Sequence, residues 1–194
     1  MSNEIDKGRR RFLTSAAVVV GGVGTAGAAM PFAASMLPSE KVRVLGGDIE
    51  VDVSGIEPGE LKIVKWRGKP VWILRRTKSM LDDIAALEER TRDPDSESSV
   101  QPEYAHNALR SINPEYLVVI GICTHLGCSP TYVPEHGVEA IGNWWRGGFF
   151  CPCHLSEYDL AGRVFEGRSP APRNLEVPPY QFLTSTILRI GDQA

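Results

Sequence analysis

Two short loops contain all four cysteines of the chain and two of its four histidines. The first is CTHLGC, at 123–128, and the second begins with CPCH, at 151–154. Cysteine thiolates and imidazoles are ligands of soft and borderline metals such as zinc and iron. Chance rarely gathers these residue types so closely, so the two loops predict a metal centre.

Four sulfur atoms and two imidazoles exceed the needs of one tetrahedral metal, and two kinds of site remain open. A zinc site of the Cys2His2 kind uses two cysteines and two histidines. A two-iron, two-sulfide cluster of the Rieske kind uses two cysteines on one iron and two histidines on the other. Either site leaves two cysteines over, and these can pair as a disulfide in an oxidising compartment.

The N-terminal segment predicts that compartment. No charged side chain occurs from Phe12 until Glu40, and about 20 helical residues suffice to cross a membrane. Because arginines precede this run and none follows closely, the N-terminus should stay in the cytoplasm while the rest of the chain crosses. Arg9 and Arg10, with the apolar pair Phe12 and Leu13 behind them, resemble a twin-arginine signal, which exports folded proteins.

Other interpretations of this segment remain. It can be an ordinary anchor whose arginines are adjacent by chance, or a cleaved secretory signal with an AxA-like site at 26–28. We predict four regions: a cytoplasmic tail with the signal at 1–11, a transmembrane anchor at 12–37, a flexible hinge linker at 38–47 and a periplasmic domain at 48–194.

The elements that must position the two loops are mostly strands. Apolar residues alternate with acidic ones from Ile49 to Val53, and LKIVKW and PVWILR flank a turn at 67–69. LVVIGI, at 117–122, predicts a buried strand that leads into the first loop, and ILRI predicts a last strand. A helix is expected within 78–90, with Ser79 as its N-cap, and a solvated loop at 92–103.

Charge excludes one class of partner. The formal net charge of −3 provides no field for binding a polyanion, so nucleic acid is not an expected partner. The histidines outside the loops, His106 and His136, are expected to be surface residues, since the loops already supply a complete ligand set.

CTHLGC followed by CPCH and then Ser-x-Tyr-Asp resembles the signature of the Rieske iron–sulfur proteins of cytochrome bc1 complexes. The resemblance extends to EVDVSGIEPGE, WRGKPVWILRRT and PAPRNLEVPPYQF. It implies a mainly β protein: an antiparallel β-sandwich Rieske domain with a helical insert, on an N-terminal transmembrane helix. A small cluster-binding subdomain would carry the loops at 123–128 and 151–158.

The resemblance also implies a [2Fe–2S] cluster with four ligands, and a disulfide between the loops. Carried over by position, the iron ligands are Cys123 and Cys151 on one iron and His125 and His154 on the other. The disulfide would join Cys128 to Cys153.

Further residues are implied to act on the cluster. Ser156 would donate a hydrogen bond to a bridging sulfide and Tyr158 one to the Cys123 sulfur, which raises the reduction potential. Leu126, Pro170 and Pro172 would cover the cluster.

The implied function is high-potential electron transfer. The subunit would take one electron from ubiquinol at the quinol-oxidation site of cytochrome b and pass it to cytochrome c1. His154 would contact the quinol and accept the proton, because reduction of the iron favours protonation of the bound imidazole. The subunit would belong to an enzyme, quinol-cytochrome c reductase, as a dimeric complex in the bacterial inner membrane with the cluster domain in the periplasm.

Two departures from the family pattern stand out. Leu155 occupies a position that is usually glycine, and we expect a negative φ there, with the side chain forming an apolar contact at the cluster tip. Arg168 and Ser169 lengthen the usual Gly-Pro-Ala-Pro loop, so its cover should differ in shape. Trp144 and Trp145 are open to a packing or a functional role.

Other functions compete with this one. The small Rieske subunit of an arsenite-oxidase-like periplasmic enzyme also uses a twin-arginine signal and a disulfide, but the helical insert favours the bc1 type over it and over the cytochrome b6f type. A dioxygenase ferredoxin needs neither an anchor nor extra cysteines. A membrane-anchored zinc or disulfide module is the alternative of a different class, and it would be colourless.

Overall fold

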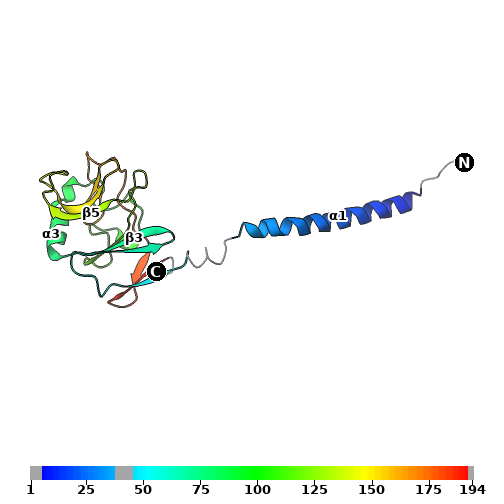
Figure 1. The fold of residues 1–194 in the computed structure, drawn as a ribbon, viewed down its shortest axis with the longest axis horizontal. Coiled ribbons are helices and arrows are strands. Elements are labelled where there is room, and N and C mark those ends of the chain that lie inside the picture. Colours follow the sequence, from blue (N-terminus) through cyan, green and yellow to red (C-terminus); the bar gives the residue numbers. More distant parts are fainter. Residues whose placement is uncertain (1–5, 38–45, 192–194) are drawn as a thin grey trace. The chain divides into compact units, whose positions relative to one another are not determined.

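The computed structural model describes residues 6–37 and 46–191, and the chain divides into two compact units, Met1–Val44 and Leu45–Ala194 (Figure 1). The predicted linker at 38–47 lies outside the described residues except for Gly46 and Gly47. Its role as a hinge, and the other domain boundaries, therefore stay predictions.

The first unit contains one helix, α1 (Lys7–Ser35). Asp6 caps it, because its side chain accepts hydrogen bonds from the backbone N–H groups of Gly8 and Arg9 at 3.0 and 3.1 Å. With 29 residues it is long and apolar enough to cross a membrane, and none of its residues is buried against other parts of the described chain.

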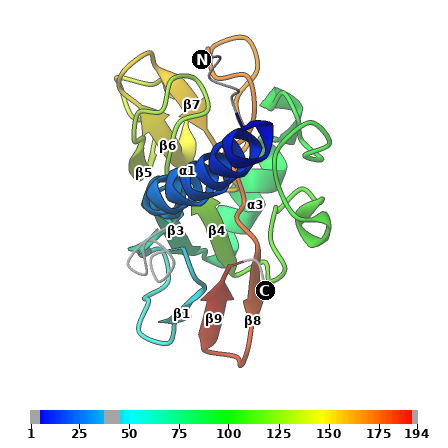
Figure 2. The ribbon, with the colours of Figure 1, turned by 90° about the vertical axis from the view of Figure 1, so that its right-hand side faces the viewer.

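The second unit is built on three antiparallel sheets of three strands each. Their orders are β1 (Ile49–Asp52), β9 (Ile187–Ile190) and β8 (Tyr180–Phe182); β2 (Leu61–Trp66), β3 (Lys69–Arg75) and β4 (Tyr116–Ile120); and β5 (Thr131–His136), β6 (Arg146–Cys151) and β7 (Ser156–Tyr158). Figure 2 shows the sheet β5–β7 at one end of this unit and β1, β8 and β9 at the other, with β3 and β4 between them. The predicted mainly β, antiparallel fold is confirmed.

The middle sheet supplies most of the core. Strand β4 is buried at every residue, and β3 is buried from Val71 to Leu74. The predicted hairpin turn between β2 and β3 consists of Arg67 and Gly68, with φ of 49° and 78°. Positive φ at both central residues gives a type I′ turn, whose twist matches that of the flanking strands.

Helix α3 (Lys78–Ala86) is the predicted helical insert, followed by the short 3-10 helices η1 (Glu88–Arg90) and η2 (Glu103–Ala105). The expected N-cap at Ser79 is wrong. Thr77 caps the helix: its backbone is extended and its hydroxyl accepts from Met80 N–H at 3.3 Å, whereas Ser79 lies inside the first turn. Ile84 is buried and packs on the core.

The expectation of a solvated loop at 92–103 is also wrong in part. The Asp93 carboxylate accepts hydrogen bonds from the backbone of Glu97 and Ser98 and from the Ser99 hydroxyl, which folds the segment on itself. Ser96 is fully buried and accepts a hydrogen bond from the Asn174 side chain. A polar composition is compatible with burial here because the polar groups pair with one another.

The sheet β5–β7 carries the two loops. Strands β6 and β7 approach closely at Gly148, where a Cβ atom would lie 2.0 Å from the Tyr158 carbonyl oxygen. Behind the sheet, Trp145 is fully buried and forms a small core cluster with Leu87, Ile141 and Phe165, against which Trp144 packs. These contacts give both tryptophans a packing role.

Candidate metal centre

The first loop follows β4 and closes on itself. Cys123 N–H donates to the Cys128 carbonyl at 2.7 Å, and Gly127 N–H donates to the Cys123 carbonyl at 3.0 Å. Gly127 has a φ of 84°, which a side chain would disfavour. The loop backbone is therefore fixed by its own hydrogen bonds.

The second loop is the tight turn between β6 and β7. Cys151 and Ser156 are paired across the two strands, so the chain reverses within the four residues between them. Leu155 has a φ of 61° and its side chain is 58% exposed. The expected negative φ is therefore wrong: the reversal needs a left-handed residue just before β7, and Leu155 adopts that conformation.

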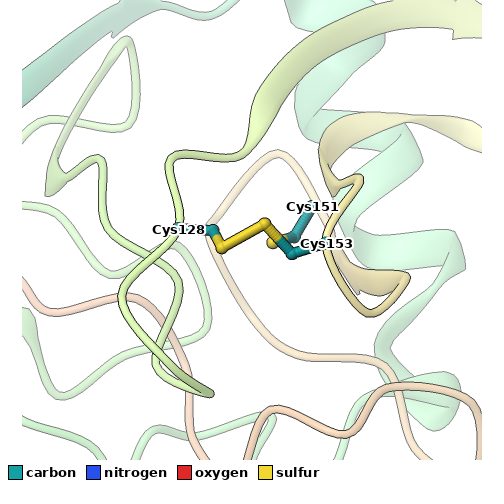
Figure 3. Close-up of side chains that lie close together, drawn as sticks. All are labelled: Cys128, Cys151 and Cys153. Carbon is teal, nitrogen blue, oxygen red and sulfur yellow. A yellow bond between two sulfur atoms is a disulfide. The ribbon is translucent and has the colours of Figure 1, made fainter.

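A disulfide between Cys128 and Cys153 joins the loops, as predicted. Figure 3 shows Cys151 beside it, and one ligand atom from each of these three cysteines lies within 4.8 Å of the others. Two of the three sulfur atoms are bonded to each other. This trio is therefore not a separate metal site.

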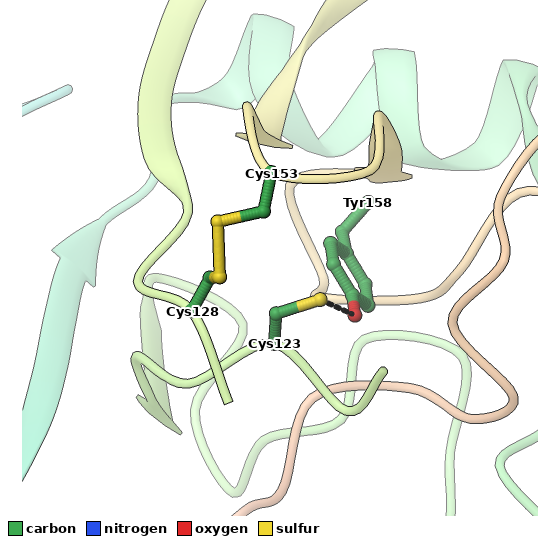
Figure 4. The surroundings of a disulfide bond; sticks show 4 residues. All are labelled: Cys123, Cys128, Cys153 and Tyr158. Carbon is green, nitrogen blue, oxygen red and sulfur yellow. Dashed lines mark hydrogen bonds between the residues drawn. A yellow bond between two sulfur atoms is a disulfide. The ribbon is translucent and has the colours of Figure 1, made fainter. Parts of the chain in front are cut away.

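The other two cysteines, Cys123 and Cys151, are free and buried. The Tyr158 hydroxyl lies 3.2 Å from the Cys123 sulfur (Figure 4). Burial opposes ionisation of Cys123, but hydrogen bonds from the Tyr158 hydroxyl and the His125 N–H outweigh it and lower its pKa. Burial, together with the neighbouring Cys123 thiol, raises the pKa of Cys151. The surroundings of Cys123 thus favour the thiolate, which is the form that binds metals.

The two loop histidines lie together. Their ring centroids are 4.8 Å apart and the rings are nearly perpendicular, at 87°. His125 Nδ1 is buried and has no hydrogen-bond partner among the described residues, whereas His154 is exposed. A buried polar atom without a partner is costly, so this nitrogen is positioned for a ligand.

Ser156 presents a second atom of this kind. Its hydroxyl oxygen is buried and finds no partner in the part of the chain that the structure describes. Two free cysteines, two facing histidines and a buried hydroxyl therefore belong to two loops that a disulfide joins. Two sulfur and two nitrogen donors form the ligand set of a [2Fe–2S] cluster of the Rieske kind.

The three residues predicted to cover the cluster differ in how they lie relative to the two loop histidines. Pro170 lines a groove of about 650 Å³ together with His125, His154 and Leu155. Leu126 is 69% exposed beside His125. Pro172 is exposed and does not line this groove, so its part in covering the cluster stays a prediction.

Sequence reasoning missed three residues around the site. The Thr124 backbone N–H donates to the Tyr158 hydroxyl at 3.2 Å, and the Thr124 hydroxyl donates to the Arg173 carbonyl at 2.6 Å. Arg92 and Ser169 line the groove beside His154. Thr124 could have been identified from the sequence because it lies between two predicted ligands, Cys123 and His125. Arg92 is distant in sequence from both loops, and Ser169 was noted only as part of an insertion.

The remaining histidines lie on the surface, in agreement with the prediction. His106 is exposed, and His136 Nε2 lies 3.0 Å from an Asp83 carboxylate oxygen. Neither belongs to the groups that surround the site between the loops.

Comparisons with known proteins point to the same kind of cofactor. A family model described as Rieske [2Fe-2S] domain matches residues 50–181, and one described as Ubiquitinol-cytochrome C reductase Fe-S subunit TAT signal matches residues 1–39. The chain is 52% identical over 188 residues to the ubiquinol-cytochrome c reductase iron-sulfur subunit of Allochromatium vinosum, covering 97% of this chain and 90% of that protein.

Two further matches have similar extents. The chain is 43% identical over 183 residues to the subunit of the same name from Bradyrhizobium diazoefficiens, covering 94% of each. A chain in the solved structure "Hyperthermophilic respiratory Complex III" aligns with a TM-score of 0.50 and 27% identity, over 90% of this chain and 98% of that one. These names favour the first predicted function over the arsenite-oxidase-like alternative.

Proposed function

Because the chain belongs to the iron-sulfur subunits of ubiquinol-cytochrome c reductase, a family with a Rieske [2Fe–2S] domain, we propose the individual steps that it performs. It takes one electron from ubiquinol at the quinol-oxidation site of cytochrome b, accepts a proton at His154, and passes the electron to cytochrome c1. The observation that supports this most strongly is the convergence of two free cysteines and two facing histidines between disulfide-linked loops.

Each ligand has a stated role. Cys123 and Cys151 would hold one iron, and His125 and His154 would hold the other. When bound, the cluster supplies a one-electron acceptor with a potential of about −150 to +300 mV, since neutral imidazoles replace two thiolates. Tyr158 and Ser156 stabilise negative charge on the sulfur atoms with their hydroxyl groups, which favours the reduced state.

His154 is the residue that meets the quinol. Of the two ligand histidines it is the exposed one, so the ring nitrogen that does not hold iron faces solvent or a bound partner. An imidazole holds its outer proton more firmly when the bound iron is reduced. His154 therefore takes the proton of the quinol hydroxyl that it contacts as the electron leaves the quinol.

The surrounding residues exclude water and orient the tip. The disulfide Cys128–Cys153 holds the two loops in one arrangement. Pro170, which lines the same groove as His154, restricts the backbone of the loop at 167–172. Leu126 and Leu155 present apolar side chains next to the ligand histidines. These side chains favour docking against an apolar surface near the membrane.

The rest of the chain places this domain. α1 anchors the protein in the bacterial inner membrane, the domain at 48–194 lies in the periplasm, and the linker at 38–47 lets it move between cytochrome b and cytochrome c1 in a dimeric complex. The support is the apolar helix and the match of residues 1–39 to an export-signal family.

A redox titration of the membrane-bound protein, followed by electron paramagnetic resonance at neutral and alkaline pH, tests the proposal. We expect a high-potential two-iron signal whose midpoint falls as pH rises and which ubiquinol reduces. A His154→Gln variant, compared with His106→Gln as a surface control, should lose quinol oxidation. A low, pH-independent midpoint in the parent protein would contradict proton-coupled transfer.

A further inference from the structure

At Glu157, the outer edge of strand β7 is hydrogen-bonded by a side chain. Among the described strands it pairs with β6, so its other edge depends on loops. There the Glu157 N–H donates to Ser169 Oγ at 2.9 Å, and Ser169 Oγ donates to the Glu157 carbonyl at 3.0 Å. Ser169 is 5% exposed. The same carbonyl also accepts from the Phe165 N–H at 3.1 Å, and Tyr158 forms an antiparallel bridge with Val164. One buried hydroxyl therefore binds the Glu157 N–H and shares the Glu157 carbonyl with the backbone of Phe165.

These two bonds lie at a critical point of the site. Glu157 stands between Ser156 and Tyr158, and because side chains alternate along a strand, those two point to the same face. The N–H group that donates to Ser169 belongs to the peptide bond between Ser156 and Glu157. The carbonyl group that accepts from Ser169 belongs to the peptide bond between Glu157 and Tyr158. Ser169 thus holds the two peptide groups from which both cluster-facing hydroxyls extend.

Arg92 in turn holds the loop that carries Ser169. Its guanidinium donates to the carbonyls of Ala171 and Ser169 at 2.6 and 3.2 Å, and it pairs with the Glu166 carboxylate at 2.8 Å. The two carbonyls flank Pro170, which has no N–H of its own to fix the loop. The rigid fork of an arginine can bind several acceptors at once, which a lysine cannot do in the same geometry.

We infer that Ser169, held in place by Arg92, is a positioning residue that sets the hydrogen bonds of Ser156 and Tyr158 and thereby the midpoint potential of the cluster. The inference rests on the ligand set in the proposed function, not on the identity of the electron donor. It also assigns a role to the lengthened loop at 167–172: the inserted Ser169 supplies the hydroxyl that binds the edge of β7 at Glu157.

The test uses the full-length protein in detergent, with the midpoint potential followed by electron paramagnetic resonance in the absence of quinol. Ser169→Ala and Arg92→Lys should each retain the two-iron signal and shift the midpoint downward, because the hydroxyls of Ser156 and Tyr158 lose their fixed placement. Ser169→Thr, which keeps the hydroxyl, should restore the midpoint of the parent protein.

A double-variant comparison separates this role from a general loss of stability. In a background that carries Ser156→Ala and Tyr158→Phe, Ser169→Ala should shift the midpoint much less than in the parent. Ser185→Ala, an exposed serine in the turn between β8 and β9, serves as the control and should cause no shift.

An unchanged midpoint in whichever variant keeps its cluster would overturn the inference, even if the melting temperature falls. Loss of the cluster from both Ser169→Ala and Arg92→Lys would overturn it as well, since assembly rather than positioning would then be at stake. Because no quinol is present, this test of Ser169 remains valid even if the protein does not oxidise quinol.

Discussion

Leu155 combines an exposed apolar side chain with a backbone conformation that favours glycine. Its φ of 61° lies in the left-handed region, which costs a residue with a side chain about 1–2 kcal/mol. Its side chain, at 58% exposure, recovers little of that cost by packing in the isolated subunit. We interpret the leucine as a residue kept for contact with a partner rather than for stability.

This interpretation predicts the effect of a glycine. Leu155→Gly should raise the free energy of unfolding by about 1 kcal/mol, because the strain is released, while the cluster still assembles. Urea denaturation measures the change. Leu126→Gly is the matched control, since Leu126 is exposed in the neighbouring loop without a positive φ, and it should bring no gain. Equal effects of the two substitutions would argue against strain at Leu155.

Glu157 predicts a pH dependence of stability. Glu157 is 3% exposed, and its Oε2 makes no hydrogen bond within the described chain. Arg168 Nε lies 3.5 Å from this Oε2. Burial raises the pKa of Glu157, against a smaller opposing effect of Arg168. The folded state therefore binds this proton more tightly than the unfolded state, so the contribution of Glu157 to stability is fully present below the ordinary glutamate range and is lost as pH rises through the folded pKa.

Glu157→Gln should remove this component. Unfolding free energies measured in urea at a series of pH values from acidic to neutral should decline less steeply in the variant than in the parent. Glu139→Gln, at an exposed position in the same half of the domain, should leave the slope unchanged. The free energy of unfolding of the parent could instead rise over this pH range, with the same slope in Glu157→Gln. That result would show that burial does not destabilise the charged carboxylate.

At the scale of elements, substitutions at the start of helix α3 test whether Thr77 or Ser79 is its N-cap. Thr77 accepts the hydrogen bond from Met80 N–H, and replacing such a cap by alanine costs about 0.5–2 kcal/mol. Thr77→Ala should therefore destabilise the domain by about 1 kcal/mol in thermal or urea unfolding. Ser79→Ala, two residues into the helix, should cost much less. The reverse order would restore Ser79 as the cap.

The disulfide is the covalent connection between the two loop elements. It closes a segment with a sequence separation of 25 residues, and a loop of this length corresponds to about 3–4 kcal/mol of lost unfolded-state entropy. In a Cys128→Ala, Cys153→Ala double variant, the free energy of unfolding measured in urea should fall by about 3–4 kcal/mol. Its cluster absorbance should also bleach faster on warming. Unaltered cluster lifetime in the double variant would mean that the loops hold their arrangement without the bond.

At the scale of the whole molecule, the two units differ in what stabilises them. No residue of α1 is buried within the described chain, whereas the second unit encloses a continuous core that runs from Val51 to Ile190. The core of the second unit is therefore formed by its own residues, while α1 is long and apolar enough to cross a membrane.

A fragment of residues 46–194 should consequently fold without the helix. We expect it to stay in the supernatant after ultracentrifugation, to show a β-rich circular dichroism spectrum and to retain the two-iron resonance signal. The full-length protein should sediment with membranes. Aggregation of the fragment, or loss of its cluster, would mean that α1 contributes to the folded domain.

Much of the fold and of the site was predictable because the informative residues lie close together in sequence. The metal-binding loops, the hairpin turn at 67–68, the helical insert and the apolar N-terminal run each depend on local spacing. The predictions that were wrong, at Ser79, Leu155 and the segment 92–103, concern local details that distant contacts or chain reversal decided.

The residue types in the sequence predicted a metal centre but left a zinc site and a Rieske cluster open, and the resemblance of the two-loop motif to a known family then implied the [2Fe–2S] cluster and the pairing of Cys128 with Cys153. Only the tertiary structure decided which groups surround those donors. The contact of Tyr158 with the Cys123 sulfur was implied by the resemblance, but the hydrogen bonds of Thr124 to the Arg173 carbonyl, 49 residues later, and of Arg92 to the Ala171 carbonyl, 79 residues later, were not. Such contacts follow from how sheets and loops pack, which no local spacing encodes.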